Sequence, residues 1–240
     1  QQPVFWFGMK ASTIVFLLLV IGFAIKIPVV PLHTWLPDAH VEAPTPISVL
    51  LAAILLKTGA YGMIRYGVLI LPNEFKTFQL LFTVMGVISI VYGSLNALAS
   101  KDLKRMIAYS SIGHMGFVVL GIGSSTAIGI QGAIFQMTSH GFISAMLFII
   151  AGILQDRTGQ RDINACSGLY KKMPGYTSII MIAFFAAMGI PGFSAFIGEL
   201  LVLIGTFSNS AIPKVIPITA TLGIILTAAY LLWTCLLYTS

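Results

Sequence analysis

Seven long apolar stretches divide the chain and constrain its fold more than any other feature. Each is long enough to cross the ~30 Å hydrocarbon core of a bilayer as a helix of roughly 20 residues. Only 8% of the residues are charged, whereas a soluble domain carries roughly 25%. The sequence therefore predicts an all-α, polytopic membrane helix bundle that forms a single transmembrane domain over residues 1–240. We expect its helices at 11–36, 45–71, 77–99, 103–123, 127–154, 176–207 and 213–237, with the first and sixth interrupted.

The rest of the composition excludes several function classes. No basic cluster is interleaved with aromatic residues, so nucleic acid is not an expected partner. The two cysteines, Cys166 and Cys235, lack metal-ligand spacing, and a disulfide framework is not expected. Because the chain begins at Gln1 and ends at Ser240 just after an apolar stretch, we expect it to be a fragment of a longer protein.

Positive residues are divided unequally between the two ends of the predicted bundle. One end carries Lys101, Lys104, Arg105, Arg157, Arg161, Lys171 and Lys172. The opposite end carries Lys10, Arg65, Lys76 and Lys214. Lysine and arginine are in excess on cytoplasmic loops, so the first end is predicted to face the cytoplasm or its equivalent. For residues at helix ends such as Lys104, Arg105 and Arg65, we expect side chains that extend to the polar surface.

Charged and titratable residues interrupt the apolar stretches. Lys26, Lys57 and Glu199 each lie inside one, and His114 and His140 lie inside two more. A lone charge at the centre of a bilayer costs at least about 2.5–3.5 kcal/mol, and such residues are usually functional. Several of them on successive helices favour a path for protons. The alternative from a different class is a structural scaffold, in which buried charges only lock the helix packing.

The two lysines differ in their surroundings. Lys57 is about a dozen residues from either end of its stretch, too deep to extend easily to the polar surface. Burial penalises its charged form, so the amine can exchange a proton near neutral pH, unless it forms a structural ion pair. Lys26 lies beside a helix break, where it either caps freed carbonyls or takes part in the path. If it is charged, its carboxylate partner is expected upstream of Gln1.

Prolines interrupt two of the predicted helices. Pro28 and Pro31 follow Lys26, and Pro191 lies about two turns before Glu199. Each proline removes an N–H and frees a carbonyl four residues back, next to Lys26 in the first case. Broken helices in matching positions of two repeats point to an ion path, although proline is also tolerated as a simple kink. The two breaks lie five helices apart, which suggests an inverted five-helix repeat.

The histidines have polar neighbours at helical spacing. Gln136 lies four residues before His140 and Ser144 four residues after it, so all three share one helix face. His114 lies one turn beyond Ser110 on the preceding helix. Such a face can hold ordered water and pass a proton along it. A packed core histidine is the alternative for each, and metal binding is not expected because no other ligand lies at suitable spacing.

Glu199 is the only acid deep in an apolar stretch. Unpaired it would be protonated, whereas a lysine or water nearby would let it exchange protons. His33, Asp38, His40 and Glu42 lie in the proline-rich segment after the first break. For these four, capping of the broken helix and a role in proton uptake are equally supported.

Several motifs together resemble the antiporter-like membrane subunits of respiratory complex I over nearly the whole chain. Glu199 resembles the M type of that family, the counterpart of mitochondrial subunit 4, where sister types usually carry lysine. The motifs are KIPVVPLHTWLPDAHVEAPT at 26–45, LLKTGAYG at 55–62, SIGHMGF at 111–117, QMTSHG at 136–141 and GEL at 198–200.

The resemblance implies roles for individual residues. Lys26 matches a lysine that pairs with a glutamate on an earlier helix, which this chain lacks. Lys57 matches the central lysine, His114 and His140 match positions along a hydrophilic axis, and Glu199 matches the exit residue. The fold implied is the antiporter-like one, with inverted five-helix repeats and with 11–36 and 176–207 as its broken helices.

These observations predict a proton-translocating membrane subunit of NADH:quinone oxidoreductase, driven by quinone reduction elsewhere. The expected partners are other membrane subunits of complex I, including sister antiporter-like subunits, and the lipid bilayer. NADH, quinone, flavin and iron–sulfur clusters are expected in partner subunits, with no cofactor in this chain. The expected location is the bacterial inner membrane, or the thylakoid or mitochondrial inner membrane. The alternatives are a subunit of an Mrp-type cation/proton antiporter and one of a membrane-bound hydrogenase.

Overall fold

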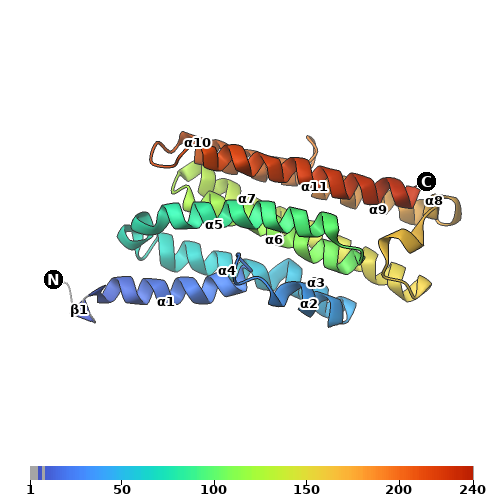
Figure 1. Ribbon diagram of the computed structural model, residues 1–240, viewed down its shortest axis with the longest axis horizontal. Coiled ribbons are helices and arrows are strands. Elements are labelled where there is room, and N and C mark those ends of the chain that lie inside the picture. The colour runs from blue at the N-terminus through green and yellow to red at the C-terminus, as the bar shows by residue number, and fades with distance from the viewer. Residues whose placement is uncertain (1–4, 7–8, 240) are drawn as a thin grey trace.

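Helices run back and forth along one long axis in the computed structural model, which describes residues 5–6 and 9–239 (Figure 1). A short hairpin precedes them, in which β1 (Phe5–Trp6) pairs antiparallel with β2 (Met9–Lys10). The chain beyond the hairpin is helical, and five of its helices are long and apolar enough to cross a membrane. The predicted class, an all-α polytopic membrane bundle, is confirmed.

The helices have the following bounds. The first half comprises α1 (Ala11–Lys26), α2 (Trp35–Glu42), α3 (Thr45–Leu50), α4 (Leu56–Gly62), α5 (Pro72–Ala99) and α6 (Leu103–Gly123). The second half comprises α7 (Ala127–Thr158), α8 (Leu169–Lys172), α9 (Pro174–Ala187), α10 (Ser194–Ser208) and α11 (Val215–Thr239). A π-helical stretch, Leu51–Leu55, joins α3 to α4, and a second one, Met63–Val68, continues α4. Together they form one continuous element, Thr45–Val68, that is long and apolar enough to span a membrane. A short 3₁₀-helix covers Ile163–Cys166.

The first interruption separates α1 from α2. α1 ends at Lys26 and α2 begins at Trp35, continuing to Glu42 and so beyond the expected end at residue 36. The carbonyl of Ala24, expected to be free, accepts a hydrogen bond from the backbone N–H of Val29 at 3.1 Å. The indole N–H of Trp35 donates to the carbonyl of Ile25 at 3.0 Å. The carbonyls of Ala24 and Ile25 at the break are therefore hydrogen-bonded within the same segment, as apolar surroundings require.

The second interruption separates α9 from α10. Gly189 follows the end of α9 with φ +68°, the left-handed conformation that glycine adopts most readily at a helix C-terminus. Pro191 lies in the turn that follows, and α10 begins at Ser194. The expected stretch 176–207 is thus two shorter helices joined by a turn.

Two helix ends differ from the sequence-based boundaries. α5 begins at Pro72 instead of residue 77, because proline is well suited to a first helical turn and Glu74 follows in the same turn. α7 continues to Thr158 instead of residue 154. Gly159, whose φ is +68°, caps its C-terminus. Apart from the end of α2 described above, the remaining predicted ends lie within about three residues of those observed, inside the expected precision.

The centre of the bundle is α6, which packs against α2, α5, α7, α10 and α11. Glycines let its neighbours approach closely: a Cβ atom at Gly86 of α5 would lie 2.8 Å from the backbone N of Leu120, and one at Gly93 would lie 2.8 Å from that of Gly113. Small residues at helix contacts are typical of membrane bundles, where association depends on close packing. α6 is therefore buried on nearly all sides.

The end that carries more positive charge is held together by backbone pairing between two loops. The N–H of Leu103 donates to the carbonyl of Arg161 at 3.0 Å, and the N–H of Ile163 donates to that of Lys101 at 2.9 Å. Arg105 forms an exposed 2.7 Å ion pair with Asp38 at the same end. The orientation of this end toward the cytoplasm stays a prediction.

A glycine substitution tests the close approach of α5 and α6. Gly86→Ala is expected to lower the free energy of unfolding by about 1–3 kcal/mol, because the added methyl group meets backbone atoms that must move. Gly22→Ala is the matched control, since a Cβ atom at Gly22 has no neighbour within 4 Å. Unfolding in detergent micelles measures both; equal stabilities for the two variants would contradict the close contact.

Candidate functional site

Lys57 and His140 form the first contact of a buried polar row. Lys57, on α4, places its Nζ 2.8 Å from the Nδ1 of His140 on α7. The same ammonium group also donates to the carbonyl of Ala52, which lies in the first π-helical stretch. Irregularities of this kind recur at functional sites. The lysine is thus held between a backbone carbonyl of its own element and an imidazole of another helix.

The row continues from His140 to His114 and Glu199. The rings of His140 and His114 lie 5.4 Å apart between centroids and are inclined by 44°. The Nδ1 of His114, on α6, lies 3.1 Å from the Oε1 of Glu199 on α10, and each of these two side chains is 6% exposed. Lys57, His140, His114 and Glu199 therefore form one connected sequence across four helices, here called the charge row.

Gln136 fixes the geometry at the Glu199 end. Its Nε2 lies 3.4 Å from both the Oε1 of Glu199 and the Nδ1 of His114. Its Oε1 and the Nε2 of His114 are buried without a hydrogen-bond partner among the described residues. Buried polar atoms in proteins are normally paired, either with protein groups or with ordered water. These two atoms are the polar groups of the row whose pairing the described residues do not supply.

Glycines place Glu199 within reach of the histidine. A Cβ atom at Gly198 would lie 3.1 Å from the Cα of Gln136, so this glycine brings α10 close to α7. A Cβ atom at Gly189 would lie 3.1 Å from the Oε2 of Glu199. The break between α9 and α10 therefore supplies the space that the carboxylate occupies.

Other residues singled out from the sequence lie outside this row. Lys26 is exposed and has no hydrogen bond or ion pair within residues 5–6 and 9–239; its Cβ lies against Gly59 of α4. Ser144 is buried on the same helix as Gln136 and His140, but its hydroxyl donates to the carbonyl of Gly141 at 3.3 Å. Pro28, Pro31 and Pro191 lie in the two turns between helix segments.

Lys104 differs from the expectation for a helix-end lysine. It is 4% exposed rather than extended to the surface, because the segment 41–46 and α7 cover it. Its Nζ lies 3.5 Å from the carbonyl of Ala43, and it lines a cavity of about 400 Å³ together with Glu42, Asp156 and Arg161. The expectation of a snorkelling lysine was wrong here.

His40 is a second buried titratable residue of the segment after the first helix break. The ring is fully buried, stacks on Phe148 at 4.3 Å between centroids, and has no hydrogen-bond partner for either nitrogen among the described residues. It lies within the electrostatic influence of both Lys104 and Lys57. The structure favours a buried polar role for His40 over simple capping of the broken helix.

One further pair of hydroxyls was not singled out from the sequence. Ser139 and Ser194 lie 2.7 Å apart and join α7 to the start of α10. Serine in an apolar stretch carries no distinguishing signal, so only the fold reveals this contact. Among the described residues, no group of three or more His, Cys, Asp or Glu side chains is arranged to hold a metal ion.

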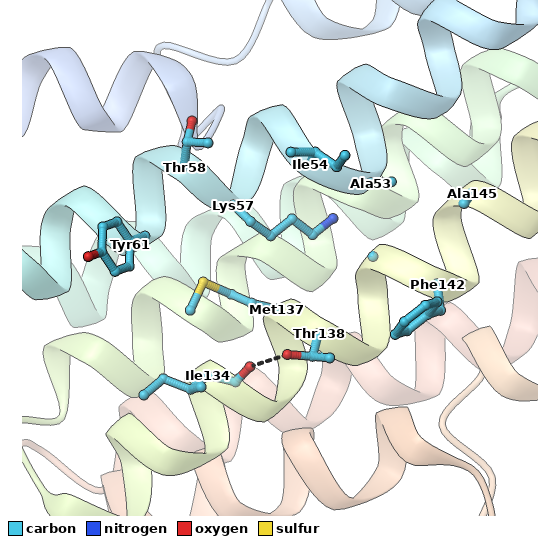
Figure 2. A pocket seen from close by; sticks show the side chains of 11 residues that line it. Ala53, Ile54, Lys57, Thr58, Tyr61, Ile134, Met137, Thr138, Phe142 and Ala145 are labelled. Carbon is cyan, nitrogen blue, oxygen red and sulfur yellow. Dashed lines mark hydrogen bonds between the residues drawn. The ribbon is translucent and has the colours of Figure 1, made fainter.

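An open, mostly apolar groove of about 640 Å³ lies on the other side of Lys57. Figure 2 shows the lysine side chain between the Thr45–Val68 element and α7, with Met137 and Phe142 on the facing helix. Phe142 is 77% exposed at its edge. Lys57 is therefore accessible from the groove and in contact with His140 at once.

Comparison with known proteins identifies relatives over nearly the whole chain. Residues 3–227 match the family described as NADH:quinone oxidoreductase/Mrp antiporter, transmembrane. The NADH-quinone oxidoreductase subunit M of Rhodobacter capsulatus is 48% identical over 92% of the chain and 43% of that protein. The subunit of the same name from Rickettsia prowazekii is 50% identical over 92% of the chain and 45% of that protein. The chain thus spans less than half the length of these curated relatives.

Solved structures agree with this relationship. A chain of respiratory complex I from Thermus thermophilus with bound NADH superposes with a TM-score of 0.89 and 35% identity, covering 99% of this chain and 49% of that one. A chain of the Mrp complex from a Dietzia species superposes with a TM-score of 0.87 and 25% identity. The superposition covers 93% of this chain and 42% of the Mrp chain.

A double-mutant cycle tests the buried pairing of His114 with Glu199. His114→Leu alone is expected to destabilise the protein by about 3–5 kcal/mol, because it leaves the carboxylate buried without its partner. His114→Leu combined with Glu199→Leu is expected to cost clearly less than the sum of the two single changes. Unfolding free energies in micelles give the coupling; strictly additive values would contradict a direct interaction.

Proposed function

The chain belongs to the transmembrane family of NADH:quinone oxidoreductase and Mrp antiporter subunits, and we propose that its charge row moves protons through a membrane subunit of NADH:quinone oxidoreductase. The observation that carries this proposal is the series of titratable side chains from Lys57 through His140 and His114 to Glu199, in which hydrogen bonds join the first and last pairs and a ring contact joins the two histidines. Amine, imidazole and carboxyl groups each exist in a protonated and a deprotonated form, so each can take up and release a proton. His140, His114 and Glu199 are buried among apolar helices, which restricts their exchange to neighbours in the row, whereas Lys57 is also reached from the open groove.

The transfer steps follow from the distances. The ammonium of Lys57 gives a proton to the Nδ1 of His140 across 2.8 Å and becomes a neutral amine. The rings of His140 and His114 are 5.4 Å apart, a separation that one water or a ring rotation bridges. His114 then passes a proton to the carboxylate of Glu199 across 3.1 Å. Each step moves one proton and leaves all other bonds intact.

Electrostatic repulsion from a neighbouring charge can drive the release of the proton from Lys57. Two unit charges about 4 Å apart interact by about 4 kcal/mol at an effective dielectric constant of ~20. A positive charge that arrives beside Lys57 therefore favours release of the lysine proton toward His140. Loss of that positive charge favours reprotonation of Lys57. Energy released elsewhere can thus act on this chain through charge alone.

The proposal also places this chain in a larger membrane assembly. We propose that other membrane subunits, including sister antiporter-like subunits, surround this chain in the bilayer of a bacterial inner membrane or of a thylakoid or mitochondrial inner membrane. NADH, flavin, iron–sulfur clusters and quinone would act in partner subunits, and this chain would contribute translocation without a redox centre. The proposal rests on relatives that are named as NADH-quinone oxidoreductase subunits.

An Mrp-type antiporter subunit is the second candidate. The Mrp chain superposes nearly as well as the complex I chain, so the fold serves both. Sequence identity favours complex I, at 48–50% for curated relatives against 25% for the Mrp chain. Translocation that depends on NADH oxidation and is unchanged when sodium is replaced by choline would support the first candidate; sodium-driven exchange would support the second.

Substitution of Lys57 distinguishes a role in a proton path from a role in a structural scaffold. Lys57→Arg keeps the positive charge, but arginine does not release its proton in proteins. In the membrane complex that contains this chain, we expect Lys57→Arg and Lys57→Met both to reduce proton translocation at least tenfold while the complex still assembles. NADH-driven acidification of proteoliposomes and native gel electrophoresis measure the two properties.

The exposed Lys76 of α5 provides the control, since Lys76→Arg should pump as the parent does. Full pumping by Lys57→Arg together with failed assembly of Lys57→Met would support the scaffold and contradict the proton path.

A further inference from the structure

The hydroxyl pair Ser139–Ser194 differs from most other serine and threonine hydroxyls of the chain. Within a helix such a hydroxyl can bond to a carbonyl one turn back, as those of Ser89 and Thr206 do at 2.7 and 2.8 Å. The hydroxyls of Ser139 and Ser194 instead bond to each other at 2.7 Å, across the contact between α7 and α10. The pair therefore uses its hydrogen-bonding capacity to join two helices.

Ser194 comes directly after the turn that separates α9 from α10. That turn contains Gly189 at φ +68° and Gly192 at φ +107°, two conformations that glycine adopts without steric strain. A Cβ atom at Gly192 would have no neighbour within 4 Å, so the turn is loosely surrounded at this point. Small residues between helix segments often serve as hinges. The hydroxyl of Ser194 thus anchors the first residue of α10 immediately after two glycines.

α7 holds the first turns of α10 at two points. Ser139 contacts Ser194 at 2.7 Å, and the Nε2 of Gln136 lies 3.4 Å from the Oε1 of Glu199. Gln136 and Ser139 are three residues apart on α7, so they are neighbours on one helix face. Ser194 and Glu199 are five residues apart on α10, which is about 7.5 Å along a helix. Two contacts at this separation restrict both sliding and rotation of α10 against α7.

We infer that the hydrogen bond between Ser139 and Ser194 is a positioning contact for the charge row, which keeps the Glu199 carboxylate within reach of His114. The inference rests on the proposed function, because it concerns proton transfer between His114 and Glu199. Ser139 and Ser194 exchange no proton with the row and act only through the placement of α10.

The step from His114 to Glu199 is sensitive to that placement. The Nδ1 of His114 lies 3.1 Å from the Oε1 of Glu199, and a separation of about 3.6 Å is no longer a hydrogen bond. A displacement of about 1 Å therefore ends the contact, and misplacement of that size can lower a rate about 100-fold. The net strength of one hydrogen bond changes an equilibrium roughly two- to twelvefold. Loss of the serine contact thus increases the share of displaced molecules without unfolding the bundle.

The first measurement is proton translocation by serine variants of the membrane complex that contains this chain. Ser139→Ala and Ser194→Ala each remove one hydroxyl of the pair, and Ser194→Thr retains it. Ser208→Ala is the matched control, because its hydroxyl lies on the same helix and bonds to the Gly205 carbonyl at 2.9 Å. We expect each variant that lacks a hydroxyl of the pair to reduce protons translocated per NADH oxidised by roughly threefold or more. Ser194→Thr and Ser208→Ala should translocate as the parent does.

The variant in which both serines are replaced by alanine extends this comparison. It should match either single variant, because all three remove the same contact. Effects that simply multiply would show that the two hydroxyls act independently, and would overturn the inference.

The second measurement, the infrared spectrum of the Glu199 carboxyl, distinguishes positioning from a merely structural role. The C=O stretch of protonated carboxyls appears in the difference spectrum between acidic and neutral pH, and the Glu199 band is assigned by its loss in Glu199→Gln. The frequency of this stretch rises when hydrogen bonds to the carboxyl are lost. We expect a shift to higher frequency in Ser139→Ala and Ser194→Ala, and the parent position in Ser194→Thr and Ser208→Ala.

The outcomes separate the positioning contact from the proposed function. Reduced translocation in both alanine variants with an unmoved Glu199 band would overturn the inference, as would translocation equal to that of Ser208→Ala. Failure of both alanine variants to assemble, judged on native gels, would assign the contact to folding and would also overturn it. Full translocation by Glu199→Gln would contradict the charge row itself, whereas a band shift in the serine variants would still establish that the contact places Glu199.

Discussion

The buried contact between His114 and Glu199 determines how the helices around it must pack. A carboxylate in an apolar bundle has to be paired, and loss of its partner costs about 3–5 kcal/mol. α10 therefore has to dock against α6 and α7 closely enough for a 3.1 Å contact. That approach is possible because Gly198 adds no side chain between α10 and Gln136, and Gly189 leaves space for the carboxylate at the helix break. The interruption before α10 is thus a requirement of the polar contact.

The charge row has opposite formal charges at its two ends. Lys57 supplies a cation and Glu199 an anion, with two imidazoles between them. This arrangement keeps the formal net charge of the row near zero and, under the proposed function, would hold the transferred proton inside an apolar bundle. A fixed ion pair between the same two end groups would be held by strong attraction at low dielectric and would resist transfer. The separation by two titratable rings divides one large barrier into smaller steps.

The sequence predicts the fold class because apolar periodicity is local, and it singles out the four residues that meet in the row, whereas Lys26, predicted together with them, lies outside it. Apolar stretches of about 20 residues predict spanning helices, and four-residue spacing places Gln136 and His140 on one face. Burial caused by remote segments could not be predicted. Lys104 is near a helix end in the sequence, yet the segment 41–46 covers it. Ser139 and Ser194 are ordinary serines in apolar stretches, yet their hydroxyls lie 2.7 Å apart across two helices that are distant in the sequence. The inverted repeat and the placement of Lys26 with a carboxylate stay predictions.

The two ends of the bundle are held together differently. The end where residues 101–103 pair with 161–163 has one cavity beside Lys104 and another beside Tyr230. At the opposite end, the Asn209 amide donates to the Ser124 carbonyl at 2.8 Å, and the Thr126 hydroxyl donates to the Gly205 carbonyl at 3.1 Å. Under the proposed function, protons that pass through the opposite end would have to cross these contacts. Direction would then require the charge state of the row to be coupled to this packing, because two ends that opened independently would only leak.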